Sequence, residues 1–199
     1  MMDTLLVATQ NRHKVEEIAE LLGDLDLRVM TLADVDPDLD IPETGDTFME
    51  NARQKALAAA RATGLLTLAD DSGLAVDALN GEPGVHSKRF ADTDAARIAK
   101  LLGLLADVPD ERRTARFHCA VVLADPDGVR QEFEETVEGV IIHAPRGAQG
   151  FGYDPVFQPL EAGGQTMAEM SMADKNAISH RGKAFRKAAQ YLLAMLGPH

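Results

Sequence analysis

The sequence predicts an α/β fold in which a mixed, twisted central sheet is flanked by helices. Short apolar runs typical of buried strands alternate with segments whose apolar residues recur at helical spacing. Two long strand-like segments, 114–124 and 129–142, are separated only by Asp125-Pro126-Asp127-Gly128, which is a hairpin signal. A hairpin is antiparallel, whereas strand–helix–strand segments favour parallel pairing, so the sheet is expected to be mixed.

The first part of the chain alternates strands and helices. The expected elements, in order, are a strand over 5–8, a helix over 12–22, a strand over 27–32, a loop over 33–45, a helix from 46 or 47 to 62 and a strand over 65–69. The first helix is predicted from apolar residues such as Ile18, which recur every three or four positions. Thr47-x-x-Glu50 fits a capping box at the start of the second helix. Gly23 and Gly64 are suitable helix ends.

The second part contains the predicted hairpin and two further helices. Its expected elements are a strand-like segment over 74–76, a turn over 80–84, a helix over 94–105, the two hairpin strands, a glycine-punctuated loop over 146–153 and a closing helix over 184–196. No internal repeat or long linker interrupts this series. The 199 residues are therefore expected to form a single domain over 1–199.

The composition limits the class of protein. Hydrophobic residues make up 45% and charged residues 26%, the usual mix for a soluble globular protein. No stretch approaches the roughly 18 apolar residues of a membrane span, and the N-terminus lacks the pattern of a signal peptide. The one cysteine, Cys119, lies in an apolar run and is expected to be a buried thiol. These features predict a cytoplasmic protein with no membrane partner.

The net charge of −12 argues against nucleic-acid binding. Such binding needs a basic surface that displaces counterions from the phosphate backbone. Acidity does not exclude a small phosphorylated substrate, because such a ligand responds to the local field and a divalent metal reverses that field.

Asp70-Asp71-Ser72-Gly73 follows the strand predicted over 65–69. Ligands of open α/β sheets bind at the carboxyl ends of strands, so two carboxylates there are candidates for chemistry. Glu43 is a candidate further oxygen ligand for Mg²⁺, which takes few protein carboxylates and completes its coordination with water and phosphate oxygens. A solvated turn is the alternative, because Asp, Ser and Gly are all turn formers.

The segment Thr9-Gln10-Asn11-Arg12-His13-Lys14 joins the first predicted strand to the first predicted helix. Backbone amides and the macrodipole at a helix start attract anions, and Lys14 can contact a phosphate from the first turn. A plain helix cap is the alternative. The pattern GxxxxGK[ST] is absent, so a Walker-type NTPase is not expected.

Two later segments combine features of a ligand site. The first is Gly150-Phe151-Gly152-Tyr153-Asp154-Pro155, in which the glycines allow the backbone to approach a planar ligand and Phe151 can stack on that ligand. The alternative is a tight turn that buries its aromatic residues. In the second, donors and positive charge gather at Lys175, His180, Arg181 and Lys183 in an otherwise acidic chain, although a solvated helix start could show the same pattern. No histidine spacing fits zinc, and no serine lies in a G-x-S-x-G elbow.

These segments together carry a family resemblance over nearly the whole chain. They are Thr9-x-Asn11-x-x-Lys14, Glu43-Thr44-Gly45-x-Thr47-Phe48-x-Glu50-Asn51-Ala52, Ala69-Asp70-Asp71-Ser72-Gly73-Leu74-x-Val76-Asp77-Ala78-Leu79, Pro83-Gly84-Val85-x-Ser87, Gly150-Phe151-Gly152-Tyr153-Asp154-Pro155 and Ile178-Ser179-His180-Arg181-Gly182. In this order they resemble the inosine triphosphate pyrophosphatase family, also called the dITP/XTP pyrophosphatases.

The resemblance implies two lobes around an active-site cleft, usually in a homodimer. It also implies hydrolysis of the purine nucleoside triphosphates ITP, dITP and XTP to the monophosphate and pyrophosphate, which keeps them out of nucleic acids. Asp71 matches the catalytic acid/base, and Asp71 with Glu43 matches the Mg²⁺ ligands. The implied substrate-binding positions are Thr9, Gln10, Asn11, Arg12, His13, Lys14, Ser72, Phe151, Gly152, Tyr153, Asp154, Lys175, His180 and Arg181.

Base selectivity is expected from hydrogen bonding to a 6-oxo purine, with Arg181 or a backbone amide as donor. Two alternatives remain open from the residues alone. One is a Maf-like nucleotide pyrophosphatase with another base preference, and the other is a non-catalytic nucleotide-binding module. The set of Glu43, Asp70 and Asp71 argues against a binding module, which could use Lys14 and the helix start alone.

Overall fold

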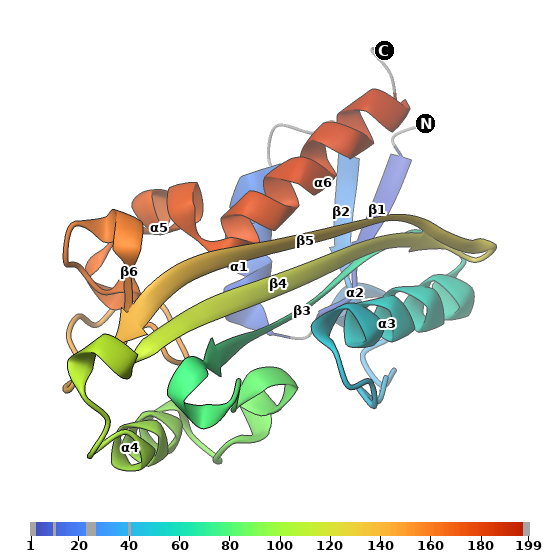
Figure 1. Cartoon of the computed structure of the whole chain (residues 1–199). Coiled ribbons are helices and arrows are strands. Elements are labelled where there is room, and N and C mark those ends of the chain that lie inside the picture. Colours follow the sequence, from blue (N-terminus) through green and yellow to red (C-terminus); the bar gives the residue numbers. More distant parts are fainter. Residues whose placement is uncertain (1–2, 10, 23–26, 40, 197–199) are drawn as a thin grey trace. The chain divides into compact units, whose positions relative to one another are not determined.

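The computed structural model describes residues 3–9, 11–22, 27–39 and 41–196, without the side chains of Asp3, Arg12, His13, Ala19 and Leu196. Within these residues the chain forms the predicted mixed sheet, in the order β2-β1-β3-β4-β5-β6 (Figure 1). The strands are β1 (Asp3–Val7), β2 (Leu27–Thr31), β3 (Leu66–Val76), β4 (Thr114–Asp125), β5 (Gly128–Ile141) and β6 (Phe157–Pro159). The α-helices are α1 (Arg12–Leu22), α2 (Leu32–Val35), α3 (Phe48–Thr63), α4 (Asp94–Leu104), α5 (Met172–Ile178) and α6 (His180–Leu196).

The sheet is mixed for the reason that the sequence suggested. β1 pairs in parallel with both β2 and β3, and β5 pairs antiparallel with β6. Only two residues separate β4 from β5, a connection that joins antiparallel strands. Asp125 shapes that turn, because its Oδ1 accepts hydrogen bonds from the amides of Asp127 and Gly128 at 2.9 and 3.1 Å. The predicted hairpin is confirmed.

Several predicted boundaries are wrong. The strand expected to end at Ala69 continues as β3 to Val76 and passes through the acidic cluster. The loop expected over 33–45 contains the end of α2, and α6 begins at His180, four residues before the expected start at 184. Neither α5 nor β6 was predicted. The predicted helix stop at Gly23 lies outside the described residues.

The start and end of α3 confirm the predicted signals. Thr47 Oγ1 accepts a hydrogen bond from the Glu50 amide at 3.1 Å, and Glu50 Oε2 accepts from the Thr47 amide at 3.1 Å, which is a complete capping box. Gly64 ends the helix in the left-handed conformation, with φ of 73°. The predicted turn around Asn80-Gly81 is also present, and Asn80 there has φ of 54°.

The chain divides into two compact units, each made of several segments. Unit 1 comprises 1–71, 119–135 and 181–199, and unit 2 comprises 72–118 and 136–180. Each unit has its own apolar core. In unit 2, α4 packs on β3, β4 and β5 around Leu101, Phe117 and Phe157, and the last two rings meet edge-on with centroids 4.7 Å apart. No described helix combines the length and apolar character needed to cross a membrane.

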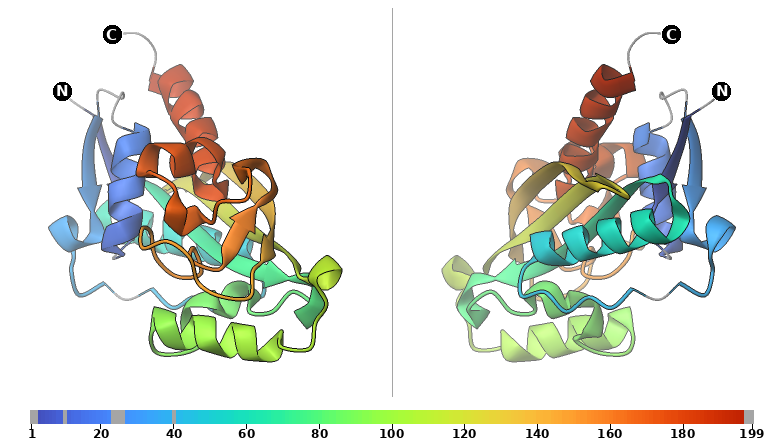
Figure 2. Two further views of the ribbon diagram at one scale, coloured as in Figure 1. Left: turned by 90° about the vertical axis from the view of Figure 1, so that its left-hand side faces the viewer. Right: turned by 90° about the vertical axis from the view of Figure 1, so that its right-hand side faces the viewer.

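Unit 1 has an apolar core on each face of its strands. Leu5 and Val7 of β1 pack with α1 and α6, while Leu6 and Ala8 pack with α3. The right-hand view of Figure 2 shows α3 in front of these strands and α6 behind them. Strands turn successive side chains to opposite faces, and β4 repeats the alternation. Cys119 of β4 is fully buried on the α6 face, as predicted.

Candidate active site

Asp70 and Asp71 lie on β3 beyond the end of its parallel neighbour. β1 ends at Val7, which is opposite Leu68, so no β1 residue pairs with β3 at the two aspartates. The predicted strand end at Ala69 is wrong, because β3 continues to Val76; the strand that ends beside the two aspartates is β1. The alternation of β3 places Asp70 on the face of α1 and α6 with Leu68, and Asp71 on the α3 face with Ala69. The two carboxylates belong to different surroundings.

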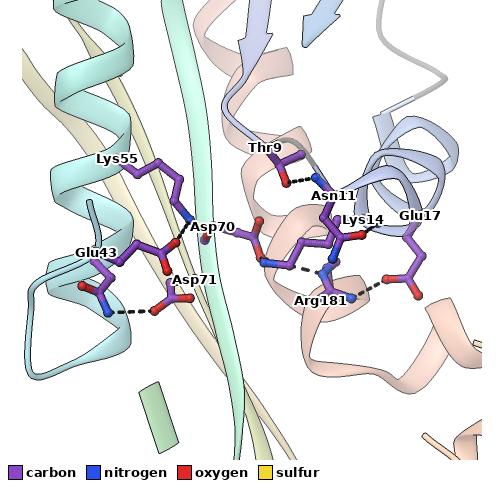
Figure 3. Close-up of polar contacts among 10 residues, drawn as sticks. Thr9, Asn11, Lys14, Glu17, Glu43, Lys55, Asp70, Asp71 and Arg181 are labelled. Atoms are coloured by element: carbon purple, nitrogen blue, oxygen red, sulfur yellow. Dashed lines mark hydrogen bonds and ion pairs between the residues drawn. The ribbon is translucent and has the colours of Figure 1, made fainter. Parts of the chain in front are cut away.

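Asp70 lies in a buried network of ion pairs (Figure 3). Its Oδ2 is 2.7 Å from Lys14 Nζ and 3.8 Å from Arg181 Nε. Arg181 also pairs with Glu17, which lies one turn after Lys14 on α1. Asp70, Glu17 and Arg181 are each less than 5% exposed. Two acids and two bases thus neutralise each other where water is excluded.

The pKa values follow from this network. Burial alone would raise the pKa of Asp70, but the charges of Lys14, Arg181 and Lys55 outweigh it and hold the pKa well below its ordinary value. Burial would lower the pKa of Arg181, but Glu17 and Asp70 raise it instead. Asp70 is therefore ionised at any physiological pH. A permanently ionised, paired carboxylate is suited to holding Lys14 and is a poor proton acceptor.

Asp71 faces a second cluster on the α3 side. Its Oδ2 accepts a hydrogen bond from Asn51 Nδ2 at 3.0 Å. Figure 3 shows Glu43 and Asp71 close together, with Lys55 beside them. Lys55 Nζ pairs with Glu43 and donates a 2.9 Å hydrogen bond to the backbone carbonyl of Asp70. Helix α3 thereby joins the Glu43 loop to β3.

Burial is the largest influence on the pKa of Asp71 and raises it, and the nearby charge of Glu43 raises it further. Lys55, Lys14 and the Asn51 hydrogen bond act in the opposite direction without cancelling these effects. For Lys55, burial favours the neutral form, but the surrounding carboxylates still raise its pKa. Asp71, unlike Asp70, is a carboxyl whose proton affinity is increased, as expected for a group that accepts a proton.

The chemistry of Asp71 and Glu43 fits a hard divalent cation. Both offer carboxylate oxygens, the ligands that Mg²⁺ prefers, and a bound cation would relieve their mutual repulsion. No group of three or more His, Cys, Asp or Glu side chains suited to a metal is found among the described residues. Two carboxylates are sufficient for Mg²⁺, which commonly binds proteins through one or two.

The segment from Thr9 to Lys14 forms a capped helix start. The Asn11 amide donates to Thr9 Oγ1 at 3.2 Å, and Asn11 Oδ1 accepts from the Lys14 amide at 3.4 Å. The plain cap that the sequence left open is therefore present, and it leaves the Lys14 side chain to reach Asp70. Gln10 lies outside the described residues. The side chains of Arg12 and His13 do too, although their backbone begins α1.

In unit 2, Asp154 organises the glycine-rich loop. Its Oδ2 accepts hydrogen bonds from the Phe151 amide at 3.0 Å and from Lys175 Nζ at 2.6 Å. A Cβ on Gly150 would lie 2.1 Å from the same oxygen, so only glycine fits there. Lys175 Nζ also lies 5.0 Å from the centre of the Phe151 ring. The structure thus brings together Phe151, Asp154 and Lys175, three of the predicted site residues.

The other predicted residues of unit 2 are positioned by the core. Tyr153 is buried and donates a 3.0 Å hydrogen bond to the Ser87 carbonyl, which matches the alternative of a turn that buries its aromatic ring. The Gly152 amide donates to Asp94 at the start of α4, at 2.7 Å. His180 stacks on Phe117, with centroids 4.8 Å apart and planes 8° from parallel. Ser72 is half-buried on β3.

Sequence reasoning missed Glu17, Asn51, Lys55 and Asp94. A signal existed for the α3 pair: Asn51 and Lys55 are four residues apart, so they share the helix face that carries the buried alanines Ala52 and Ala56. Glu17 precedes the buried Ile18 and lies one turn after Lys14. A polar residue on the buried face of a helix needs a partner, and that need is visible in a sequence. The identity of the partner is not.

The mixed sheet and the charged clusters on β3 define an α/β protein whose polar site is built where a parallel strand ends. The chain belongs to the Ham1 family, whose profile matches residues 5–191. This confirms the family that the motifs predicted.

The chain is similar to proteins named dITP/XTP pyrophosphatase. The protein from Desulforamulus reducens is 50% identical over 191 residues, 94% of each chain. That from Geobacillus kaustophilus is 51% identical over 189 residues, 94% of this chain and 92% of the other. Among solved structures, a HAM1 protein from Coxiella burnetii has a TM-score of 0.88 at 43% identity, covering 97% of this chain and all of that one.

Proposed function

We propose that this protein is a nucleoside-triphosphate pyrophosphatase that hydrolyses non-standard purine triphosphates (ITP, dITP and XTP) between the α- and β-phosphates. The products are a nucleoside monophosphate and pyrophosphate, and the reaction keeps these nucleotides out of nucleic acids. The observation that best supports this function is the environment of Asp71, a buried carboxyl with a raised pKa that lies beside Glu43 on the α3 face of β3. The names of the relatives in the Ham1 family support the substrate class.

Asp71 is proposed to orient the attacking water and accept its proton. Its raised pKa brings the group nearer to the operating pH, which favours proton transfer. Lys14 is proposed to stabilise phosphate oxygens, because Asp70 holds its ammonium group at the helix start. Thr9 to His13 would contribute to the same phosphate contact. Asp70 is then a positioning group and not the base.

Mg²⁺ is proposed as the cofactor, held by Asp71 and Glu43. When bound, such an ion neutralises phosphate charge and polarises the bond that breaks. The two carboxylates would bind it through oxygen, and Lys55 keeps Glu43 beside β3. The same two carboxylates argue against a non-catalytic nucleotide-binding module, because like charges held side by side cost stability that simple binding does not require.

Base recognition is proposed for unit 2 and for Arg181. Phe151 is a stacking surface whose backbone and lysine neighbour are ordered by Asp154. Ser72, Gly152, Tyr153, Lys175 and His180 are proposed as further substrate contacts. Arg181 retains its charge between Glu17 and Asp70, and its guanidinium is a hydrogen-bond donor of the kind that a 6-oxo group accepts. We further propose one functional domain over 1–199, a homodimer and a cytoplasmic location.

The experiment is to compare Asp71→Asn with the wild-type protein for release of pyrophosphate from dITP in Mg²⁺. We expect kcat to fall by about 100-fold to 10,000-fold, the usual contribution of a positioned acid or base. Because burial and Glu43 disfavour the charged form of Asp71, the same variant should unfold at a higher temperature in EDTA at pH 7.

Asp127→Asn is the matched control, since Asp127 is exposed at the β4–β5 turn. It removes the same charge and should leave both kcat and thermal stability near wild type. Near-normal turnover by Asp71→Asn would exclude Asp71 as the base.

A further inference from the structure

Asn51, in the first turn of α3, is fully buried and joins two parts of the site. Its Oδ1 accepts a hydrogen bond from the Gly45 amide at 2.8 Å, and its Nδ2 donates to Asp71 Oδ2 at 3.0 Å. The two partners determine how the amide is oriented. A flipped amide would place its oxygen against a carboxylate and its NH₂ against an N–H, losing both bonds.

The loop that carries Glu43 is pressed against the start of α3. A Cβ on Gly45 would lie 2.6 Å from Glu50 Cβ and 3.0 Å from Asn51 Oδ1, so glycine is needed for this close approach. Gly45 is two residues after Glu43. The hydrogen bond from the Gly45 amide to Asn51 therefore fixes the backbone near Glu43, one proposed metal ligand. The hydrogen bond from Asn51 to Asp71 acts directly on the second proposed ligand.

The start of α3 does not depend on Asn51. The capping box of Thr47 and Glu50 fixes the first turn, and Glu50 Oε2 also accepts from the Asp46 amide at 2.9 Å. Because α3 is already capped, the Asn51 side chain adds little to the stability of the helix itself: both of its hydrogen bonds go to residues outside α3. The bonds of Asn51 instead fix groups outside α3: the plane of the Asp71 carboxylate and the position of the Gly45 backbone.

We infer that Asn51 is a positioning residue that sets the orientation of the Asp71 carboxylate and its separation from Glu43. This inference rests on the proposed function of Asp71 and Glu43. Groups that orient metal-binding or catalytic carboxylates typically contribute about 10-fold to 100-fold to activity or metal affinity. The side-chain hydrogen bonds of Asn51 go to Gly45 and Asp71 and not to Lys14 or the Phe151 loop, so its effect falls on turnover and not on nucleotide binding.

Two variants separate the two bonds. Asn51→Asp keeps an acceptor for the Gly45 amide but replaces the donor to Asp71 with a carboxylate oxygen. Asn51→Leu removes both bonds at similar volume. With dITP we expect both variants to lower kcat by about 10-fold or more, with KM within about 3-fold of wild type. The increase in unfolding temperature caused by Mg²⁺ alone should also be smaller than in wild type.

Thr47→Ala is the control for a purely structural effect. It removes the side-chain cap of the same helix and leaves the hydrogen bond between Asn51 and Asp71 in place. We expect wild-type kcat and a wild-type Mg²⁺ shift. The inference is overturned if Asn51→Asp turns over dITP like wild type, or if Thr47→Ala loses as much kcat as the Asn51 variants. Absence of pyrophosphate release by the wild-type protein would instead reject the proposed function.

Discussion

Asp70 and Asp71 are adjacent and chemically identical, yet their pKa values shift in opposite directions. The cause is the alternation of a β-strand, which turns one carboxylate toward Lys14 and Arg181 and the other toward Glu43 and Asn51. One becomes a permanent anion that holds cations. The other acquires the proton affinity of a base. Adjacent carboxylates on a strand can therefore have different roles, because each side chain has its own neighbours.

The lowered pKa of Asp70 predicts a pH-dependent contribution to stability. The folded state binds a proton at Asp70 less readily than the unfolded chain does, because an aspartate in an unfolded chain has a pKa of about 3.9. The stabilisation is therefore complete above that pH and is lost as pH falls through the folded-state pKa. Asp70→Asn should lower the free energy of unfolding at pH 7 by about 3 kcal/mol or more, because it leaves the buried Arg181 and the half-buried Lys14 short of a partner.

Urea unfolding at pH 7, 5 and 3 measures this effect. The difference between wild type and Asp70→Asn should be constant from pH 7 to 5 and should narrow at pH 3. Asp127→Asn serves again as the exposed control. A difference that is the same at all three pH values would show that Asp70 stabilises the fold through its shape and not through its charge.

The motifs located most of these groups but not their partners. Asp71, Glu43 and Lys14 could be proposed from residue type and order. The pairing of Arg181 with Glu17, or of Asn51 with Asp71, depends on contacts between residues far apart in the chain. Hydrogen bonds of this range follow from how α1, α3 and α6 pack on the strands, which one sequence does not specify residue by residue.

At the scale of elements, left-handed and helical backbone conformations place opposite demands on glycine. Gly64 ends α3 with φ of 73°, whereas Gly103 is a helical residue in the last turn of α4, with no atom within 4 Å of an added Cβ. Gly64→Ala should lower the free energy of unfolding by about 1 kcal/mol, because alanine is strained in the left-handed region. Gly103→Ala should raise it by about 0.5–1 kcal/mol, because alanine favours a helix.

Chemical denaturation of the two variants beside wild type tests this pair. The same substitution is made twice, so a general effect of the added methyl group would move both variants in the same direction. Opposite signs are expected. Stabilisation by Gly64→Ala would mean that α3 ends in a conformation other than the one described.

The sequence predicted well the elements that carry a strong periodicity, a cap or a turn signal, and predicted poorly those that lack one. Helices α1 and α3 have strong periodicity or caps, and the hairpin has its turn, so their bounds were nearly correct. β3 was cut short because Asp, Ser and Gly favour turns locally. Its position in the sheet between β1 and β4 overrides that preference. The four-residue α2 and three-residue β6 are too short to leave a periodic signal.

At the scale of the molecule, each unit combines a core with its own charged or polar groups. Unit 1 packs α1 and α6 on one face of its strands and α3 on the other, which brings Lys14, Asp70 and Arg181 together on one face and Glu43 and Asp71 together on the other. Ion pairs from β5 to α3 (Glu132 with Arg53) and from β5 to α6 (Glu135 with Lys187) hold both helices to the strands. Unit 2 orders the Phe151 loop through Asp154.

The central claim is that this protein cleaves non-standard purine triphosphates at the α–β bond. The most direct test follows the products formed from dITP in Mg²⁺ by ³¹P NMR, with dGTP and ATP measured in parallel. We predict equal amounts of dIMP and pyrophosphate, formed at least about 100-fold faster than the corresponding products of ATP, since a site that hydrogen-bonds a 6-oxo purine rejects the 6-amino group of adenine. The products of dGTP should also form more slowly than those of dITP; because guanine shares the 6-oxo group, this difference depends on its 2-amino group. Formation of dIDP and orthophosphate, or turnover of dGTP or ATP as fast as dITP, would contradict the account.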